Sequence, residues 1–301
     1  MNDLISVIIP TYNHAHFLEK AIQSVINQTY TNWEIIVIDN HSKDNTDEVV
    51  NGFKDQRISL LKVNNNGVIA LSRNVGIKAA KGKLIAFLDS DDLWYPSKLE
   101  SCYAKISSGY DMVCHGEYWI NNEKGKWKKR KVFYGPEEKA TFDNLLFEGN
   151  CISTSAVVVS RWYLEQVSGF DESSDMITAE DYHLWIKLAK AGARIGFVSE
   201  ILGEYMIHTG NTSKAAMRSF HAINTVFEKI YTELPSHSIK TKIRALRRRG
   251  IITYIGGRGL QNNIEFIKAL PFFLKAIVYW PFMPKFYVAL LLNILHRSKT
   301  L

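Results

Sequence analysis

The sequence contains little cysteine, and none of it in a metal-binding pattern. The 301 residues include three cysteines, Cys102, Cys114 and Cys151, and no two of them form a C-x-x-C pair. This spacing argues against a disulfide framework and against the usual zinc ligand sets, so we expect free, buried thiols. The chain begins directly in a strand pattern, without a basic and apolar leader, so we expect no secretory signal.

Acidic residues are scarce in the C-terminal part of the chain. Residues 214–301 contain 15 Lys and Arg against three Asp and Glu, a net charge of +12. Residues 1–213 contain 22 against 27, a net charge of −5, and the two parts account for the +7 of the whole chain. We therefore expect an anionic partner for the basic part: nucleic acid, a phosphate-bearing substrate or a membrane surface.

A long hydrophobic run is also missing. The most apolar stretch, Ile264–Leu295, is interrupted by three lysines and three prolines. Its uncharged pieces are shorter than the roughly 18 apolar residues that span a bilayer. Aromatic residues beside these lysines, such as Tyr279, Trp280 and Phe286, are typical of helices that lie in the membrane interface. We therefore expect residues 214–301 to contact a membrane surface, with an ordinary helical subdomain as the alternative.

Strand and helix patterns alternate through residues 1–90. Short runs of strand-forming residues predict strands at 5–9, 34–38, 58–63 and 84–88, with a helix pattern between each pair. This alternation predicts a parallel, doubly wound sheet with right-handed crossovers. Ligands of such sheets bind beyond the carboxyl ends of the strands. We therefore expect one pocket to form from three polar strand tips, Pro10–Asn13, Asp39–Asn40 and Asp89–Asp91.

The pattern is looser after Trp94. Glu180 and Asp181 begin an amphipathic helix, and the chain is predicted to be helical from about residue 214. We also predict strands at 112–120, 154–159 and 193–198, a charged hairpin or substrate-contacting loop at 124–131, and an irregular stretch at 201–213.

Three aspartates follow the predicted strand at 84–88. Asp89, Asp91 and Asp92 place like charges close together, which is costly unless a cation shares the site. Mg²⁺ typically binds one or two carboxylates together with phosphate oxygens. The stretch therefore indicates a metal site or, alternatively, an acidic turn that caps a following helix through Asp91 or Asp92.

Six motifs occur in a characteristic order: Ser6–Asn13, Ile38–Asn40, Ser72–Asn74, Asp89–Asp92, Glu180–Asp181 and His208. Together they resemble the inverting family-two glycosyltransferases with the GT-A fold, of the type that builds bacterial surface glycans. The resemblance covers residues 5 to about 213. It implies an α/β fold with a doubly wound, mostly parallel sheet. Residues 1–213 would form the nucleotide-sugar-binding catalytic domain, and 214–301 a C-terminal helical extension.

The resemblance implies a donor site at the strand tips and a metal ion beside it. Mn²⁺ or Mg²⁺ is expected on Asp91, with Asp89 and His208 as further ligands. The family often has an arginine shortly before the histidine, and this chain has Met206 there, so one phosphate contact is missing. In this assignment Asp92 only caps a helix. Contacts to the nucleotide-sugar are expected from Pro10, Thr11, Tyr12, Asp39, Asn40, Arg73, Asp89 and Ser90.

The resemblance assigns the chemistry to Asp181 and Glu180. Asp181 is expected to act as the general base that takes the proton of the acceptor hydroxyl, and Glu180 to orient or contact the acceptor. Without the resemblance, the pair fits a helix N-terminus, where the helix dipole favours acidic residues. The sequence suggests no serine, histidine and aspartate triad, and it has no G-x-x-x-x-G-K-[ST] phosphate loop.

The implied activity is a metal-dependent, inverting transfer of a hexose from a UDP-sugar to a glycan acceptor. The acceptor is expected on a polyprenyl diphosphate, in the synthesis of a surface polysaccharide such as O-antigen or capsule. The enzyme would then be peripheral on the cytoplasmic side of the inner membrane. Two other classes stay open: a nucleotide-binding protein without catalysis, and a nucleic-acid-binding protein that uses Arg244–Arg249. The acidic charge of residues 1–213 argues against the second class, so we expect no nucleic-acid partner.

Overall fold

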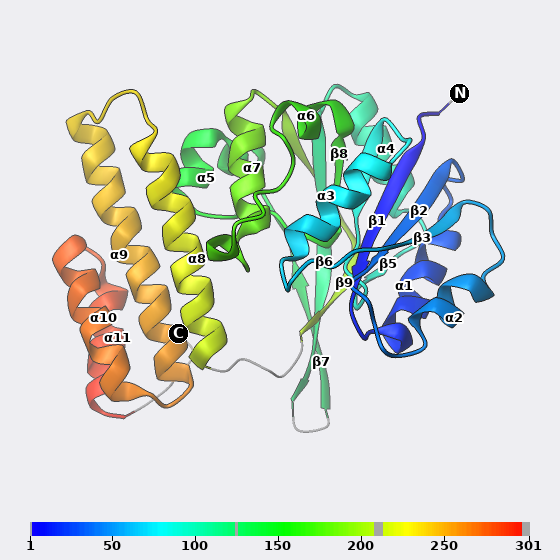
Figure 1. Ribbon diagram of the computed structural model, residues 1–301. Helices are drawn as coiled ribbons and strands as arrows, with labels where there is room; N and C mark the ends of the chain where they lie inside the picture. Colours follow the sequence, from blue (N-terminus) through cyan, green and yellow to red (C-terminus); the bar gives the residue numbers. More distant parts are fainter. Residues whose placement is uncertain (1, 124–125, 208–212, 297–301) are drawn as a thin grey trace. The chain divides into compact units, whose positions relative to one another are not determined.

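The structure, a computed structural model, describes residues 2–123, 126–207 and 213–296, and the chain forms two compact units (Figure 1). The first unit comprises Met1–Leu145, Asn150–Glu172 and Asp181–Thr209, and the second comprises Leu146–Gly149, Ser173–Glu180 and Gly210–Leu301. The long segment of the second unit begins close to the change of charge at residue 213. Two short segments from earlier in the chain also belong to this unit. The functions assigned to the two parts of the chain stay predictions.

Within the described residues, the first unit is built on a nine-stranded sheet. Its strands are β1 (Ile5–Thr11), β2 (Trp33–Asp39), β3 (Ile58–Lys62), β4 (Leu84–Phe87), β5 (Leu93–Trp94), β6 (Met112–Glu123), β7 (Lys126–Val132), β8 (Val157–Ser160) and β9 (Ile195–Ile207). The strand order is β3-β2-β1-β4-β8-β6-β9-β5, and β7 pairs with β6. The pairs β1–β2, β2–β3, β1–β4 and β6–β9 are parallel, and the other neighbours are antiparallel.

In residues 1–90 helices alternate with the strands, as the sequence predicted. The helices are α1 (Ala15–Ile26), α2 (Thr46–Gly52), α3 (Ile69–Ala79), α4 (Lys98–Ser107), α5 (Phe142–Glu148), α6 (Arg161–Gln166) and α7 (Glu180–Lys190). Short 3₁₀ turns are η1 (Glu137–Ala140), η2 (Thr154–Ala156) and η3 (Ser174–Met176). The charged segment after β6 is confirmed as a hairpin, because β7 pairs antiparallel with β6, although residues 124–125 lie outside the described residues.

The irregular stretch predicted at 201–213 is wrong for residues 201–207. Strand β9 continues to Ile207, and it pairs in parallel with β6 as far as Asn121. The hydrogen bonds of β9 therefore depend on a strand from a distant part of the sequence. Strand propensity depends strongly on such context, so the local sequence pattern did not predict this part of β9.

The side chains of β1 point alternately into two hydrophobic layers. Val7 and Ile9 are fully buried in one core cluster together with Leu18 of α1. Ile8 points to the other face and contacts α3, since a Cβ added to Gly76 would lie 2.5 Å from Ile8 Cγ2. Because successive side chains of a strand point to opposite faces, α1 and α3 cover opposite faces of the sheet. The predicted doubly wound arrangement is confirmed.

The strand order reverses beside β1. Strands β2 and β3 extend the sheet on one side of β1, whereas β4 pairs on its other side. In open α/β sheets, ligands bind in the crevice beyond the carboxyl ends of the strands at such a reversal. Thr11 ends β1, Asp39 ends β2, and Asp89 follows β4. The polar tips that were expected to converge therefore lie at one edge of the sheet.

The second unit is helical. Its long segment contains α8 (Ser213–Thr232), α9 (Ile239–Asn262), α10 (Phe266–Tyr279) and α11 (Pro284–Ile294). Leu260, Ala269, Phe273 and Ala289 form a buried core between α9, α10 and α11. None of the helices in the described part of the chain is long and apolar enough to cross a membrane.

The basic run in α9 is partly neutralised within this unit. Arg249 donates hydrogen bonds to both carboxylate oxygens of Glu228, each at 2.7 Å. Arg247 forms an ion pair with Glu148 at 2.5 Å, and the buried Arg248 donates to the backbone oxygen of Glu148 at 3.2 Å. These arginines stabilise the packing of the helical unit, which argues against their use as a nucleic-acid-binding surface.

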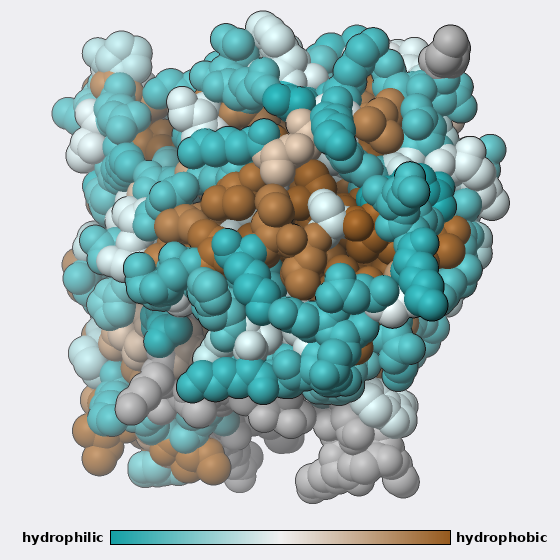
Figure 2. Space-filling view, turned by 45° about the vertical axis from the view of Figure 1, so that its right-hand side comes forward, coloured by the Kyte–Doolittle hydropathy of each residue, from teal (hydrophilic) through white to brown (hydrophobic). Residues whose placement is uncertain are grey.

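Large apolar side chains of α10 and α11 remain exposed. Ile267 and Val278 of α10 are 86% and 81% exposed, and Leu274 between them is also exposed. Leu291 and Ile294 of α11 are exposed as well, and we call these five side chains the α10–α11 apolar surface. On the face that Figure 2 shows, a patch of hydrophobic residues lies near the middle and is bordered by hydrophilic ones.

Gly82→Ala is expected to destabilise the first unit. Gly82 precedes β4, and a Cβ there would lie 2.5 Å from Leu4 O and 2.8 Å from Ser6 N. These are backbone atoms at the start of β1, so relief of the clash must disturb the β1–β4 pairing. We expect a loss of about 1–3 kcal/mol in the free energy of unfolding, measured by urea denaturation.

Gly52→Ala in α2 is the matched control for this variant. A Cβ at Gly52 meets no atom within 4 Å. Alanine also restricts the unfolded chain more than glycine does, so we expect a gain of about 0.4–1 kcal/mol. Equal stability of the two variants would contradict the tight approach at Gly82.

Candidate functional site

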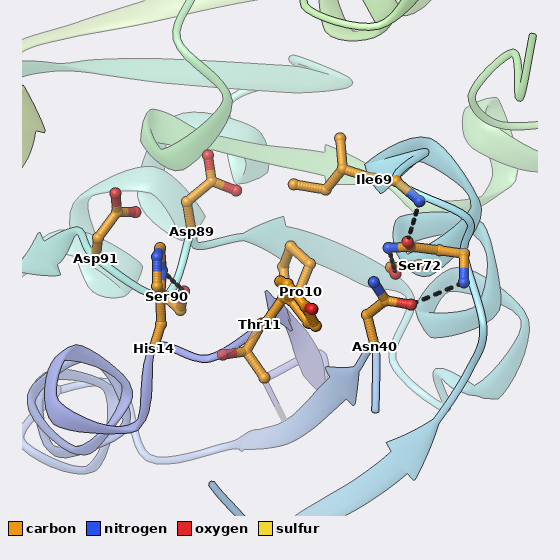
Figure 3. A pocket seen from close by; sticks show the side chains of 12 residues that line it. Pro10, Thr11, His14, Asn40, Ile69, Ser72, Asp89, Ser90 and Asp91 are labelled. Atoms are coloured by element: carbon orange, nitrogen blue, oxygen red, sulfur yellow. Dashed lines mark hydrogen bonds between the residues drawn. The ribbon is translucent and has the colours of Figure 1, made fainter. Parts of the chain in front are cut away.

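A cavity of about 400 Å³ lies at the carboxyl ends of the N-terminal parallel strands (Figure 3). Its lining comes from the ends of β1 and β2, the loop and first turn of α3, and the turn after β4. The lining residues are Pro10, Thr11, Tyr12, His14, Asn40, Asn65, Gly67, Ile69, Ser72, Asp89, Ser90 and Asp91. The structure thus brings together seven of the predicted site residues from three separate segments.

Five of the lining residues were not predicted: His14, Asn65, Gly67, Ile69 and Ser72. Asn65 Nδ2 donates to Ser72 Oγ at 2.8 Å, and the Asn65 backbone N–H donates to Asn40 Oδ1 at 2.9 Å. Asn65 and Gly67 follow the third strand, so the rule that strand ends converge could have identified them. The positions of His14 and Ile69 had no such signal in the sequence.

The rim at β1 offers an aromatic face and a polar group. Tyr12 at the tip of the strand is 51% exposed, so a flat ligand group can pack on its ring. Thr11 Oγ1 is buried and has no hydrogen-bond partner among the described residues. These two features favour a ligand that combines a ring with polar edges.

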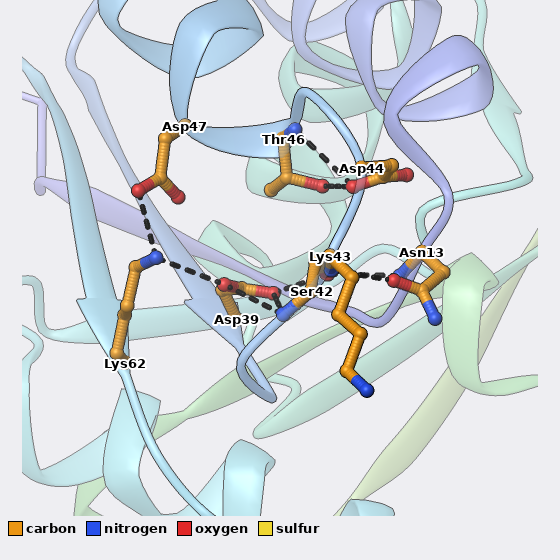
Figure 4. Close-up of polar contacts among 8 residues, drawn as sticks. All are labelled: Asn13, Asp39, Ser42, Lys43, Asp44, Thr46, Asp47 and Lys62. Atoms are coloured by element: carbon orange, nitrogen blue, oxygen red, sulfur yellow. Dashed lines mark hydrogen bonds and ion pairs between the residues drawn. The ribbon is translucent and has the colours of Figure 1, made fainter.

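Asp39, a predicted nucleotide contact, is fully buried and holds the loop after β2 (Figure 4). Its carboxylate accepts hydrogen bonds from the N–H and the hydroxyl of Ser42, and Lys62 Nζ lies 3.7 Å from Oδ2. Ser42 Oγ accepts the backbone N–H of Asn13 at 2.8 Å, so the loops after β1 and β2 are tied together. Asp39 therefore lies next to Asn40, which lines the cavity, and its carboxylate is used within the loop.

Arg73 contacts the acidic turn from α3. Its buried guanidinium donates to Asp89 Oδ1 at 2.8 Å and lies 5.5 Å from the ring of Phe170. Asp89 lines the cavity, whereas Arg73 stands beside it in the helix. The ion pair orients one carboxylate of the turn and brings a fixed positive charge to the edge of the site.

The prediction that Asp92 caps a helix is wrong. The residues that follow it form β5, and α4 begins only after that strand. Asp92 is 1% exposed, and it accepts the hydroxyl of Ser155 at Oδ2 and the N–H of Met206 at Oδ1. Burial raises the pKa of Asp92, and the neighbouring charges of Asp89 and Asp91 raise it further. Asp92 is therefore a buried anchor of the acidic turn.

A second buried carboxylate, Glu117 of β6, lies close enough to this turn for the charge of Asp89 to affect its pKa. It accepts the hydroxyl of Tyr134 at 2.7 Å. Burial raises the pKa of Glu117 to about 7, the charge of Asp89 adds to the rise, and the hydrogen bond from Tyr134 opposes it. Lys98 is also fully buried, and burial lowers its pKa to about 8. The charges of Asp89 and Asp91 thus disfavour the charged forms of their carboxyl neighbours, and a bound cation would relieve this repulsion.

The chemistry of the turn fits a divalent cation held partly by substrate. Among the described residues, no group of three or more His, Cys, Asp or Glu side chains is arranged to hold a metal ion. Asp89 and Asp91 both line the cavity. Two carboxylates beside a cavity with room for phosphate suit Mg²⁺ or Mn²⁺, which complete their coordination with substrate oxygens and water. His208, the third predicted ligand, lies outside the described residues.

Asp181 is connected to the acidic turn through one short segment. Thr154 Oγ1 donates to Asp181 Oδ2 at 2.9 Å. The next residue, Ser155, donates to Asp92 and accepts the backbone N–H of Asp89 at 3.1 Å. The structure therefore brings the predicted base to the same part of the first unit as the cavity.

Glu180 differs from Asp181 in that it contacts the turn just before α7. It is buried, and its Oε2 accepts the backbone N–H of Thr178 at 2.8 Å. Thr178 has a φ of 84°, so this hydrogen bond stabilises a turn that is unfavourable for threonine and leads into α7. A contact of Glu180 with the acceptor stays a prediction.

The sequence is similar to known glycosyltransferases. The sequence profile of Glycosyl transferase family 2 matches residues 6–167. WfgD of Escherichia coli, a UDP-Glc:alpha-D-GlcNAc-diphosphoundecaprenol beta-1,3-glucosyltransferase, is 38% identical over 188 residues, which are 62% of this chain and 70% of that protein. WfaP of the same species carries the same activity name and is 30% identical over 228 residues, 76% of this chain and 87% of that protein. TuaG of Bacillus subtilis, a putative teichuronic acid biosynthesis glycosyltransferase, is 29% identical over 232 residues, 72% of this chain and 86% of that protein.

Solved structures share the fold at low sequence identity. S. aureus TarS 1-349 in complex with UDP has a TM-score of 0.59 at 16% identity, covering 97% of this chain and 92% of that chain. The mannosyltransferase PcManGT from Pyrobaculum calidifontis, in complex with GDP-Man and Mn²⁺, has a TM-score of 0.64 at 17% identity, covering 98% and 85%. These similarities concern the fold alone. They confirm the predicted α/β architecture with C-terminal helices.

Glu117 is expected to make the stability of the first unit depend on pH. Its pKa is about 7 in the folded chain, against an ordinary value of 4.5. Between these values the folded state keeps a proton that the unfolded state has lost, so the free energy of unfolding falls as the pH rises. Glu117→Gln keeps an acceptor for Tyr134 but cannot ionise. Between about pH 5 and pH 8, we expect the free energy of unfolding to fall by about 1–3 kcal/mol less in this variant than in the unmodified chain. Urea unfolding at each pH measures the difference.

Asp55→Asn is the control, because Asp55 is expected to change stability with pH in the opposite direction. The hydrogen bond from Arg57 holds the pKa of Asp55 below its usual value. Any stability that Asp55 contributes is therefore present at neutral pH and lost as the pH falls. A pH dependence in Glu117→Gln equal to that of the unmodified chain would contradict the role given to Glu117.

Proposed function

The chain belongs to glycosyl transferase family 2, and on this basis we propose that it transfers a sugar, with inversion, from a UDP-sugar to a glycan acceptor in surface-polysaccharide synthesis. The main support for this proposal is the position of Asp181 relative to the cavity. Three strand tips converge on one cavity, and the predicted base, Asp181, is tied to the acidic turn of that cavity through Thr154 and Ser155. A nucleotide-binding protein without catalysis would need the cavity but not Asp181.

The cavity suits the nucleotide part of the donor. A volume of about 400 Å³ is in the range of small-molecule sites. Tyr12 offers a ring face for the base, and Thr11 and Asn40 offer polar groups for the base edge or the ribose. The two E. coli relatives are named for UDP-Glc, which supports a UDP-sugar as the donor here.

The transfer needs a base on the acceptor side and support for the leaving diphosphate. Asp181 takes the proton of the acceptor hydroxyl while that oxygen attacks the anomeric carbon. The bond from this carbon to the diphosphate oxygen breaks on the opposite side, so the configuration at the carbon inverts. Arg73, paired with Asp89, supplies positive charge near the phosphates, and Glu180 orients the acceptor.

A divalent cation belongs to this proposal. Mn²⁺ or Mg²⁺ would be held by Asp91, with Asp89 and His208 as further ligands, and would neutralise negative charge on the leaving diphosphate when bound. The pKa of Asp92 supports this assignment. Burial raises it most, and the charges of Asp89 and Asp91 raise it further, so these carboxylates repel one another. A cation at the turn would offset that repulsion.

The proposed acceptor is a glycan on a polyprenyl diphosphate. The E. coli relatives are named for transfer to GlcNAc-diphosphoundecaprenol, and TuaG for teichuronic acid biosynthesis. Such a lipid presents its glycan at a membrane surface. The enzyme would therefore act as a peripheral protein on the cytoplasmic side of the inner membrane.

Exposed side chains of the second unit support a location at the membrane surface. The α10–α11 apolar surface stands beside the lysines of the same helices, Lys268, Lys275 and Lys285. Exposed apolar side chains together with lysines are typical of helices that lie in the membrane interface. The net charge of +12 on residues 214–301 adds attraction to anionic lipids.

Asp91→Asn and Asp181→Asn are each expected to lower kcat about 10²–10⁴-fold, because one removes a cation ligand and the other the base. Transfer is measured as UDP released from UDP-glucose with Mn²⁺ and a GlcNAc-diphospholipid, and EDTA should stop it. Titration with UDP separates the two roles. Asp91→Asn should weaken the binding of UDP in Mn²⁺, whereas Asp181→Asn should leave it unchanged.

Asp55→Asn is the control for these variants, since Asp55 lies outside the cavity and in an ion pair with Arg57. It should retain full transfer. Undiminished transfer in both Asp91→Asn and Asp181→Asn would exclude the proposed mechanism.

The double variant Ile267→Glu/Val278→Glu is expected to bind vesicles of phosphatidylglycerol and phosphatidylcholine about 10-fold more weakly than the unmodified chain. Each change replaces an exposed apolar side chain with an anion that anionic lipids repel. Co-sedimentation measures the binding, and circular dichroism checks that the fold is kept. Trp162→Glu, at an exposed aromatic side chain of α6, is the control and should bind as the unmodified chain does. Full binding by the double variant would contradict a membrane role for this surface.

A further inference from the structure

We propose that Thr154 and Ser155 form a positioning pair, in which Thr154 orients the base Asp181 and Ser155 holds the acidic turn. The inference rests on the proposed function, because it takes Asp181 as the base. The sequence predicted a strand at 154–159, and the structure instead places residues 154–156 in the turn η2 ahead of β8. None of the motifs that carry the family resemblance includes this turn.

On one side, the turn contacts Asp181. Thr154 is buried, and its Oγ1 donates to Asp181 Oδ2 at 2.9 Å. The backbone N–H of Tyr182 donates to Asp181 Oδ1 at 2.6 Å. Each carboxylate oxygen therefore has a fixed donor, and one of the two donors comes from outside α7. A carboxylate has about four lone-pair sites, and donors on both of its oxygens set the direction in which it points.

On the other side, the turn contacts the acidic residues after β4. Ser155 is buried, and its Oγ donates to Asp92 Oδ2 and accepts the backbone N–H of Asp89. The backbone oxygen of Ser155 accepts the indole N–H of Trp94 at 2.7 Å. Ser155 is thus bonded to the first and last aspartate of the turn and to the strand β5 that follows it.

The two residues are consecutive, so one rigid turn holds both Asp181 and the acidic residues. An inverting transfer requires the base and the leaving diphosphate on opposite sides of the anomeric carbon. A displacement of about 1 Å between such groups can cost about 10²-fold in rate. A direct link between the base and the diphosphate-binding turn therefore fixes the distance on which the reaction depends.

The alternative is a purely structural role for Thr154. A buried hydroxyl needs a hydrogen-bond partner for stability alone, and Asp181 supplies one. A structural role predicts loss of stability without a specific loss of turnover. A positioning role predicts loss of turnover while donor binding and stability are kept close to those of the unmodified chain.

The test compares Thr154→Val, which keeps the shape but lacks the hydroxyl, with Thr154→Ser, which keeps the hydroxyl. We expect Thr154→Val to lower kcat about 10–100-fold, with the KM for UDP-glucose and the affinity for UDP within about 2-fold of the unmodified chain. Thr154→Ser should restore kcat to within about 3-fold, because the donor to Asp181 is regained.

Thr46→Val is the matched control. Thr46 is also a buried threonine whose hydroxyl donates to an aspartate, Asp44 Oδ1 at 2.6 Å, but neither residue lines the cavity. This variant should lose stability on heating and keep kcat in the folded fraction. It therefore measures what the loss of a buried threonine hydroxyl does when no base is involved.

Asp181→Asn separates this inference from the proposed function. Full transfer by Asp181→Asn would mean that the base assignment has failed. If Asp181→Asn is inactive while Thr154→Val has an unchanged kcat, the positioning role is overturned and the proposed function stands. A loss of kcat that Thr154→Ser does not restore, or an equal loss in UDP affinity, would also overturn the positioning role.

Discussion

The hydrogen bond between Ser155 and Asp92 joins the parts of the candidate site, and their arrangement depends on it. Asp92 is buried, and its other oxygen accepts the N–H of Met206 in β9. One carboxyl group therefore holds the turn after β4, the turn η2 and strand β9 together. A buried polar group that loses a partner costs far more than an exposed one, so these three segments cannot move independently at low cost.

Charge is the second constraint on the site. Asp89, Asp91 and Asp92 lie together, with Glu117 close enough for its charge to matter, and burial raises the pKa of both Asp92 and Glu117. Arg73 offsets part of this charge through its ion pair with Asp89. Of these carboxylates, Asp89 and Asp91 line the cavity, whose volume is in the range of small-molecule sites. The proposed divalent cation would offset the repulsion between these carboxylates.

The basic side chains of the second unit are partly paired and partly exposed. In the second unit, Arg247 and Arg249 pair with Glu148 and Glu228, so part of the basic run stabilises the helices. The α10–α11 apolar surface and the lysines of the same helices remain exposed. Fewer cations are therefore available to a polyanion than the sequence count suggests.

The parallel half of the sheet, and the edge at which its strands end, could be predicted from the residue pattern alone. Residues 1–90 carry the alternating periodicity of strands and helices, and parallel strands must place their carboxyl ends together, so Thr11, Asn40 and Asp89 could be assigned to one pocket. The roles of Asp91 and Asp181 depended on the family resemblance, because an acidic pair at a helix start has the same local pattern without catalysis.

The hydrogen-bond partners of the carboxylates could not be predicted in this way. Asp92, expected at a helix cap, is buried against Ser155 and Met206. Asp39 is bonded to Ser42 within its loop, and its contact with the nucleotide stays a prediction. The link from Thr154 to Asp181 had no signal in the sequence either. Each of these contacts except that of Asp39 joins residues far apart in the chain. The donor that a carboxylate oxygen receives is set by how such segments pack, and local residue patterns do not contain that information.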